Sequence, residues 1–264
     1  MRILLSIDGS SPAEEAAAWV AGRRWAEGST VRVLAVDDAY GEDRALLDDA
    51  LERAAARVGQ AGVAVERALR AGRAATLILA EAATWGADLV VVGSRGRGRI
   101  GSLLLGSVST EVLERARAAV LVVRLPRMAG LLVAVDGSPP SREVAPFLCA
   151  SGAVSDVPAT VVSVSRDAEP WPPQLDASAA RAATRAAAAL ARCGVEARRE
   201  VLVGDPAAAI LAAAAERGVD LVAVGSRGQS RLRGLLLGSV ARNLASSAPC
   251  SVLVVRRPPG RSAR

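Results

Sequence analysis

Glycine and serine recur in this chain at a spacing that suits phosphate binding. Two sets of residues share the pattern G-x2-G-x9-G-S: Gly93, Gly96, Gly106 and Ser107 in the first half, and Gly225, Gly228, Gly238 and Ser239 in the second. Glycine lets backbone N–H groups approach an anion because it has no Cβ atom. A Gly-Ser pair that opens a helix adds amides and a dipole that favour phosphate, and the serine hydroxyl is a further donor. The alternative is that the glycines only turn the chain and the serines only cap helices.

An aspartate follows the first apolar run of each half, Asp8 in ILLSIDGSSP and Asp136 in LLVAVDGSPP. At the end of a strand in an open parallel sheet, such a carboxylate faces the crevice where ligands bind, and it can accept hydrogen bonds from a ribose or a base. The other interpretation, which the residues leave equally open, is an Asx turn within Asp-Gly-Ser.

Arginine supplies the positive charge of both glycine-rich segments. Its planar guanidinium suits bidentate contacts with phosphate. One arginine in each half is expected to make such a contact, out of Arg95, Arg97, Arg99, Arg227, Arg231 and Arg233. The candidates are Arg95 and Arg227, and the others are expected to be solvated surface.

Other nucleotide-binding and catalytic motifs do not fit. Gly96, Gly98 and Gly101 match the G-x-G-x-x-G of dinucleotide-binding turns, but the second half lacks two of these glycines, and the match follows the fourth apolar run rather than the first. A P-loop needs a lysine and a catalytic triad of the usual kind needs a histidine, and the chain contains neither residue. We therefore expect a binding protein rather than an enzyme. Slow ATP hydrolysis, with Asp8 or Asp136 helping to hold Mg²⁺, stays open.

The motifs belong to a repeat that runs through the chain. Residues 86–96, GADLVVVGSRG, match residues 218–228, GVDLVAVGSRG. Short runs of Val, Ile and Leu alternate with Ala-rich segments, which is typical of strands separated by helices. Strands are expected at 2–7, 30–36, 63–69, 88–92 and 119–124, and again at 131–136, 159–165, 195–202, 220–224 and 251–256. The fourth and fifth runs are apolar throughout, which indicates parallel strands covered on both faces and a doubly wound α/β fold.

Length and composition set the domain organisation and exclude several partners. The 264 residues are predicted to form two domains, 1–125 and 130–258, and the first helix is expected to begin at a capping box of Ser11, Pro12 and Glu14. The net charge of +6 is carried by arginine, and only 2% of the residues are aromatic, so no nucleic-acid partner is expected. No apolar stretch reaches the roughly 20 residues of a membrane span, so no membrane partner is expected.

The chain has three cysteines, Cys149, Cys193 and Cys250. They lack CxxC spacing, which favours reduced thiols in the cytoplasm over a disulfide framework or a metal site.

The glycine pattern and the aspartates resemble those of the universal stress protein family, whose ATP-binding members carry G-x2-G-x9-G-[S/T] after the fourth strand and an aspartate at the end of the first. The resemblance covers both halves, as in tandem-domain members. It implies a Rossmann-like five-stranded sheet of order 3-2-1-4-5 in each domain, with an adenine nucleotide lying across the first, second and fourth strands. It adds Val36 and Val108 to the first site and Val164 and Val240 to the second.

The resemblance also implies a function. We expect a cytoplasmic ATP-binding stress-response protein in which nucleotide occupancy changes a surface that a regulatory protein partner reads. In the family the fifth strands pair across a two-fold axis, which implies a homodimer or an intramolecular pseudo-dimer through 120–124 and 252–256. The alternatives are a weak ATPase and a structural dimer whose nucleotide sites are not used. Ala71-Gly72-Arg73 replaces Val203-Gly204-Asp205 between the copies, which leaves the path after the third strand open.

Overall fold

The computed structural model describes residues 1–38, 44–96, 105–165, 177–228 and 237–256. The chain forms two compact units, Met1–Arg127 and Met128–Arg264. Ala129 is hydrogen-bonded within the second unit, because its amide donates to Asp220 Oδ2 at 2.7 Å.

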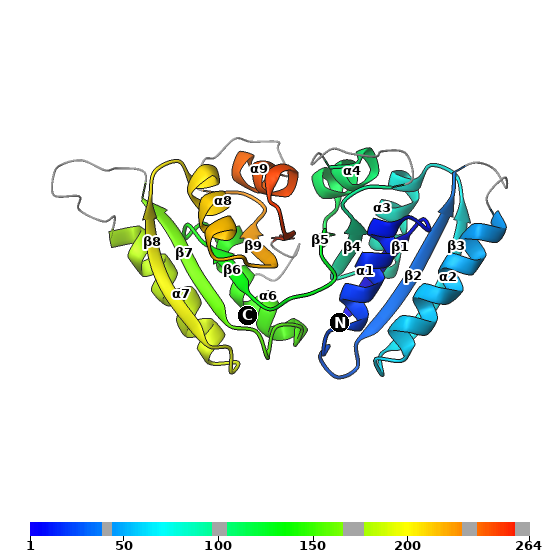
Figure 1. Cartoon of the computed structure of the whole chain (residues 1–264), viewed down its shortest axis with the longest axis horizontal. Coiled ribbons are helices and arrows are strands. Elements are labelled where there is room, and N and C mark those ends of the chain that lie inside the picture. The colour runs from blue at the N-terminus through cyan, green and yellow to red at the C-terminus, as the bar shows by residue number, and fades with distance from the viewer. Residues whose placement is uncertain (39–43, 97–104, 166–176, 229–236, 257–264) are drawn as a thin grey trace. The chain divides into compact units, whose positions relative to one another are not determined.

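The first unit is built around a parallel sheet (Figure 1). Its strands are β1 (Arg2–Ile7), β2 (Thr30–Asp37), β3 (Ala64–Ala71), β4 (Leu89–Gly93) and β5 (Ala119–Val123). Their order is β3-β2-β1-β4-β5, and every neighbouring pair is parallel, which confirms the predicted fold class and topology. Because the chain reverses its direction of winding between β1 and β4, the crevice for a ligand is expected beyond the carboxyl ends of these two strands.

Helices cover both faces of this sheet. On one face α1 (Ser11–Ala21) packs with α2 (Arg44–Gly59), and on the other α3 (Ala74–Trp85) packs with α4 (Ser107–Arg115). All residues of β4 and β5 are buried, as their unbroken apolar sequences predict. The edge strand β3 instead exposes polar side chains such as Glu66 and Arg67.

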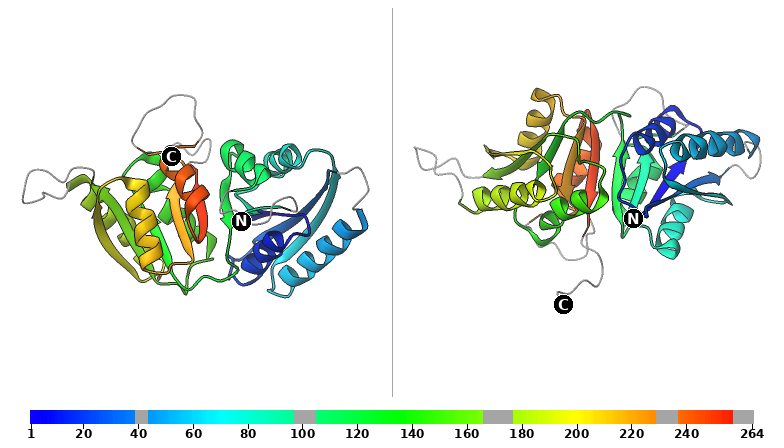
Figure 2. Two further views of the ribbon diagram at one scale, coloured as in Figure 1. Left: turned by 45° about the horizontal axis from the view of Figure 1, so that its top comes forward. Right: turned by 90° about the horizontal axis from the view of Figure 1, so that it is seen from below.

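The second unit repeats this architecture with one change (Figure 2). Its strands run in the order β8-β7-β6-β9-β10 and comprise β6 (Leu131–Ala134), β7 (Ala159–Ser165), β8 (Ala197–Val203), β9 (Leu221–Gly225) and β10 (Ser251–Val255). Its described helices are α5 (Pro139–Arg142), α6 (Val144–Ser151), α7 (Ala177–Ala191), α8 (Pro206–Glu216) and α9 (Ser239–Ser247). The counterpart of α1 is thus divided into α5 and α6. Pro146 explains the division, because it has no N–H for the carbonyl of Arg142 and its ring clashes with that carbonyl.

The first helix begins one residue earlier than its sequence suggests. Ser10 is the N-cap of α1, with extended backbone angles, and its side chain accepts a hydrogen bond from the amide of Ala13 at 3.4 Å. The capping box predicted at Ser11 is therefore wrong, because Ser11 is already the first helical residue. Either hydroxyl of the Ser10-Ser11 pair could have capped the helix. The chain turns at Gly9, with φ 77°, and the helix begins directly after Ser10.

The chain leaves the third strand in the same way in both units, which answers a question that the sequence leaves open. Gly72 and Gly204 both have positive φ, 135° and 121°. Only the capping differs: Asp205 accepts a hydrogen bond from the amide of Ala208 at 2.9 Å, whereas Arg73 makes no side-chain cap.

The expectation that the cysteines form no disulfide is wrong. Cys149 of α6 and Cys193, two residues beyond α7, are joined by a disulfide, with their Cα atoms 5.7 Å apart. The helices α6 and α7 pack against each other, so their C-terminal ends bring together two cysteines that are 44 residues apart. A test for CxxC spacing detects local pairs and misses a pair that helix packing creates. Cys250 is buried and takes no part in the bridge.

We predict that the bridge stabilises the second unit. Replacing both cysteines, Cys149→Ser with Cys193→Ser, should lower the free energy of unfolding by about 2–4 kcal/mol, because a loop of this length in the unfolded chain is no longer closed. Urea unfolding with and without dithiothreitol measures the effect. The reductant should destabilise the parent and leave the double variant unchanged. Equal midpoints for parent and double variant without reductant would contradict the prediction.

Candidate functional site

A cavity opens at the carboxyl edge of the sheet in each unit. The first has a volume of about 350 Å³ and the second about 480 Å³. The structure brings together every residue predicted for the first site: Asp8, Val36, Gly93, Arg95, Gly96, Gly106, Ser107 and Val108. It does the same for the second: Asp136, Val164, Gly225, Arg227, Gly228, Gly238, Ser239 and Val240. The other residues named in these segments lie outside the described part of the chain: Arg97, Gly98, Arg99, Gly101, Arg231 and Arg233.

The first glycine of each motif is required by packing rather than by a ligand. A Cβ atom at Gly93 would lie 2.7 Å from the backbone carbonyl carbon of Pro12, and one at Gly225 would lie 2.7 Å from the amide nitrogen of Ser141. Real Cβ atoms do not come so close to a backbone. The first turns of α1 and α5 can therefore approach the ends of β4 and β9 only because these residues are glycines.

The second glycine of each motif lies directly beneath an aspartate. A Cβ atom at Gly96 would lie 2.6 Å from Asp8 Oδ2, and one at Gly228 would lie 2.8 Å from Asp136 Oδ2. Each aspartate and its glycine thus share one corner of the cavity.

Each aspartate makes the predicted Asx turn and also lines its cavity. Asp8 Oδ1 accepts hydrogen bonds from the amide of Ser10 at 3.0 Å and from its hydroxyl at 2.6 Å. Asp136 Oδ1 accepts one from the amide of Ser138 at 2.9 Å. One carboxylate oxygen therefore makes the Asx turn, while the aspartate also lines the cavity.

The third glycine opens a helix that has no side-chain cap. Gly106 and Gly238 are the N-caps of α4 and α9, and neither helix has a side-chain hydrogen bond at its start. Ser107 and Ser239 are the first helical residues, so the alternative that these serines cap the helices is wrong. Since the first amides of a helix have no partner within it, two helix N-termini present hydrogen-bond donors beside the cavities, in the arrangement that binds phosphate.

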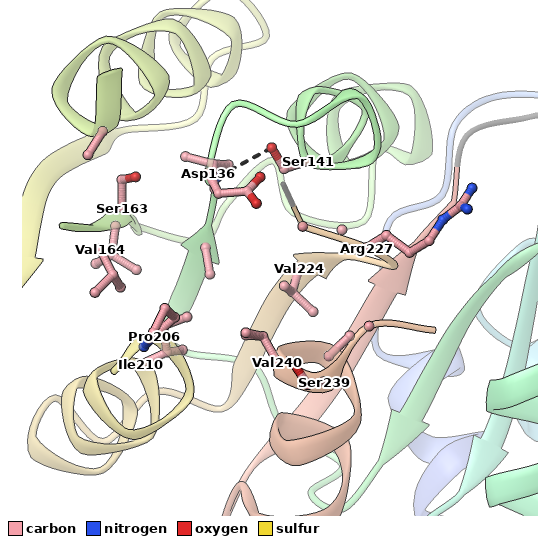
Figure 3. Close-up of a pocket in the computed structure, with 18 of the residues that line it drawn as sticks. Asp136, Ser141, Ser163, Val164, Pro206, Ile210, Val224, Arg227, Ser239 and Val240 are labelled. Atoms are coloured by element: carbon pink, nitrogen blue, oxygen red, sulfur yellow. Dashed lines mark hydrogen bonds between the residues drawn. The ribbon is translucent and has the colours of Figure 1, made fainter. Parts of the chain in front are cut away.

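Apolar side chains from the second strand and the third long helix of each unit line another part of its cavity. In the second cavity Val164 of β7 lies near Pro206 and Ile210 of α8, across from Ser239 and Val240 of α9 (Figure 3). Ile78 of α3 occupies the position of Ile210 in the first cavity. No motif in the sequence marks the α3 and α8 residues, but the repeat contains a signal: Ile78 and Ile210 are separated by the same 132 positions as the glycine motifs.

The two cavities carry different charges. In the first unit burial raises the pKa of Glu15, and the nearby charge of Arg95 opposes that rise. In the second unit burial and the charge of Arg227 lower the pKa of Arg256 to about 10. Asp38 adds a second carboxylate to the lining of the first cavity, and the described lining of the second has no counterpart. Among the described lining residues, the second cavity therefore has one carboxylate fewer than the first.

The described residues contain no group of three histidine, cysteine, aspartate or glutamate side chains placed to hold a metal ion. The described helices also include none that is long and apolar enough to cross a membrane.

The chain matches one protein family over nearly its whole length. The model of the Universal stress protein family matches residues 1–124 and again residues 130–256. A universal stress protein of Mycobacterium tuberculosis (strain H37Rv) is 33% identical over 232 residues, which cover 81% of this chain and 76% of that protein. One from Mycolicibacterium smegmatis is 35% identical over 188 residues, which cover 64% of this chain and 62% of that protein. The chain thus spans less than two thirds of the length of this second relative.

A solved structure shares the fold. The crystal structure of a universal stress protein from Archaeoglobus fulgidus has a TM-score of 0.68 and 22% sequence identity, and the match covers 97% of this chain and 98% of that one. Two domains with the order expected for this family, and two matches to its model, lead to one conclusion: the chain belongs to the universal stress protein family and contains two of its domains in tandem.

Proposed function

We propose that this protein binds ATP in both cavities and acts as a nucleotide-dependent stress-response protein without strong catalytic activity. One observation carries the proposal: in each unit an uncapped helix N-terminus and a strand-end aspartate line the same cavity. The donors suit the phosphates, the carboxylate suits the hydroxyls of a ribose, and the apolar far end suits a base. The volumes fall within the range of about 300–1,000 Å³ that is typical of small-molecule sites.

The fit is better for the nucleotide than for a metal ion. Mg²⁺ in such a complex is usually held by phosphate oxygens, water and one or two carboxylates. Asp8 and Asp136 each have one oxygen engaged in an Asx turn, so we propose that each offers Mg²⁺ at most its other oxygen.

The proposal extends to partners and location. Nucleotide occupancy would change the surface around α4 and α9, and a regulatory protein would read that change. Pairing of fifth strands would make a homodimer or an intramolecular pseudo-dimer. We propose that the protein acts in the cytoplasm, where disulfides are rare, so that the Cys149–Cys193 bridge would form there only under oxidising conditions.

Blocking each cavity separately tests the proposal. In Gly96→Val and Gly228→Val the new side chain would fill a cavity and displace only the flexible carboxylate of an aspartate. Isothermal titration with ATP should give two bound nucleotides in the parent, one in each single variant and none in the double variant.

A glycine away from the cavities provides the control. In Gly59→Ala, at the end of α2, the new Cβ atom makes only an ordinary contact at 3.9 Å, and binding should be unchanged. Retention of two bound nucleotides by the double variant would show that ATP does not use these cavities.

The charge difference between the cavities predicts a difference in affinity. The test uses a Gly228→Val background, in which only the first site can bind ATP. There Asp38→Asn should tighten ATP binding about threefold to tenfold, because it removes one negative charge from the exposed edge of the cavity. The gain should shrink at high salt. Asp48→Asn, which changes an exposed carboxylate of α2 outside the cavity lining, should have no effect. An equal response to both substitutions would refute a local effect of Asp38.

Weak ATP hydrolysis is the second candidate, because an aspartate lines each cavity. We expect phosphate release far below the roughly 1 per second of a slow kinase, and the same rate in the parent and in a double variant, Asp8→Ala with Asp136→Ala. A phosphate-release assay with Mg²⁺ and saturating ATP measures both rates. A fast parent rate that the double substitution abolishes would make the protein an ATPase.

A further inference from the structure

One polar group of the second cavity has no hydrogen-bond partner among the described residues. Ser163 of β7 lines this cavity, and its side chain is 2% exposed. Its Oγ atom is buried and makes no hydrogen bond within the part of the chain that the structure describes. Buried hydroxyls are nearly always hydrogen-bonded, since burying a hydroxyl without a hydrogen bond costs free energy. A ligand bound in the cavity could therefore supply the hydrogen bond that this hydroxyl lacks.

The position of Ser163 indicates which part of a nucleotide it would meet. Figure 3 shows Ser163 and Val164 on the side of the cavity opposite Ser239 and Val240. On the proposed function the phosphates lie at the N-terminus of α9, which has no side-chain cap. The nucleoside must then extend toward β7, whose described lining residues are Val162, Ser163 and Val164, so that Ser163 carries the one polar side chain among them.

The first unit lacks this hydroxyl. The amide of Gly72 bonds to the carbonyl of Asp37, and the amide of Gly204 bonds to the carbonyl of Ser165. When the two units are aligned on these bonds, Ala35 of β2 is the residue equivalent to Ser163. Ala35 is fully buried and lies outside the lining of the first cavity. The same backbone position therefore accepts alanine without loss of the fold.

We propose that the Ser163 hydroxyl makes a hydrogen bond to the nucleoside of the nucleotide held in the second site, and that this contact distinguishes the second site from the first. The inference rests on the proposed function, because it takes the phosphates to lie at α9. A hydroxyl both donates and accepts, so it can serve a ring nitrogen or exocyclic group of the base as well as a ribose hydroxyl. It acts on specificity and affinity, not on chemistry.

The test compares two ligands in a protein whose first site is blocked by Gly96→Val. Isothermal titration with ATP should show a dissociation constant three- to tenfold higher in Ser163→Ala, the loss expected for one hydrogen bond. Inorganic tripolyphosphate, which has no nucleoside, should bind equally well with and without the hydroxyl. Ser165→Ala is the matched control, since Ser165 is buried on the same face of β7 but does not line the cavity; it should leave the ratio of the two affinities unchanged.

The stability of the ligand-free protein gives a second readout that needs no nucleotide. Removing a hydroxyl without a partner should leave the melting temperature of Ser163→Ala unchanged or raise it. A lower melting temperature would show that Ser163 has a structural partner, and the inference would fall.

The outcomes separate this inference from the proposed function. If the parent binds ATP at the second site and Ser163→Ala binds it as tightly, the inference fails and the proposed function stands. If Ser163→Ala weakens ATP and tripolyphosphate alike, the hydroxyl acts at the phosphate end and the inference also fails. If the parent binds no ATP, both fail.

Discussion

Both sites depend on the contact between a helix start and the end of the fourth strand of the sheet. At Gly93 and Gly225 the backbone of the neighbouring helix lies where a Cβ atom would be. This close approach carries the aspartate that precedes the helix over the next glycine of the motif, so that Asp8 meets Gly96 and Asp136 meets Gly228. Van der Waals packing within the protein thus shapes the corner of each cavity before any ligand arrives.

The glycines consequently have a different role from the one that their spacing first suggests. Two of the three in each motif make room for the protein's own atoms, and the donors for an anion come from the starts of α4 and α9. A side-chain cap there would occupy the first-turn amides. Glycine at the N-cap has no side chain to occupy them, and a Cβ atom at Gly106 or Gly238 would also lie only 3.2 or 3.3 Å from the Cα atom of Arg95 or Arg227.

The two units share their backbone plan and differ in chemistry. The lining of the first cavity includes the additional carboxylate of Asp38, and the lining of the second includes the buried hydroxyl of Ser163. The second unit also has its first helix divided at Pro146 and its α6 joined to α7 by a disulfide. The two units thus share the arrangement of glycines, aspartate and helix start, and they differ in the residues around it.

The amino-acid sequence alone determined the repeat, the strands and the glycines, aspartates and serines that line each cavity, because these depend on apolar periodicity and on motifs that are local in the chain. The order of the strands was implied by the resemblance to the family. Only the tertiary structure decided which serine caps α1, that Cys149 and Cys193 meet, and that Ile78, Ile210 and Ser163 reach the cavities. Those outcomes depend on the packing of helices against strands that are distant in sequence. The spacing of residues along a chain carries no information about that packing until the sheet brings them together.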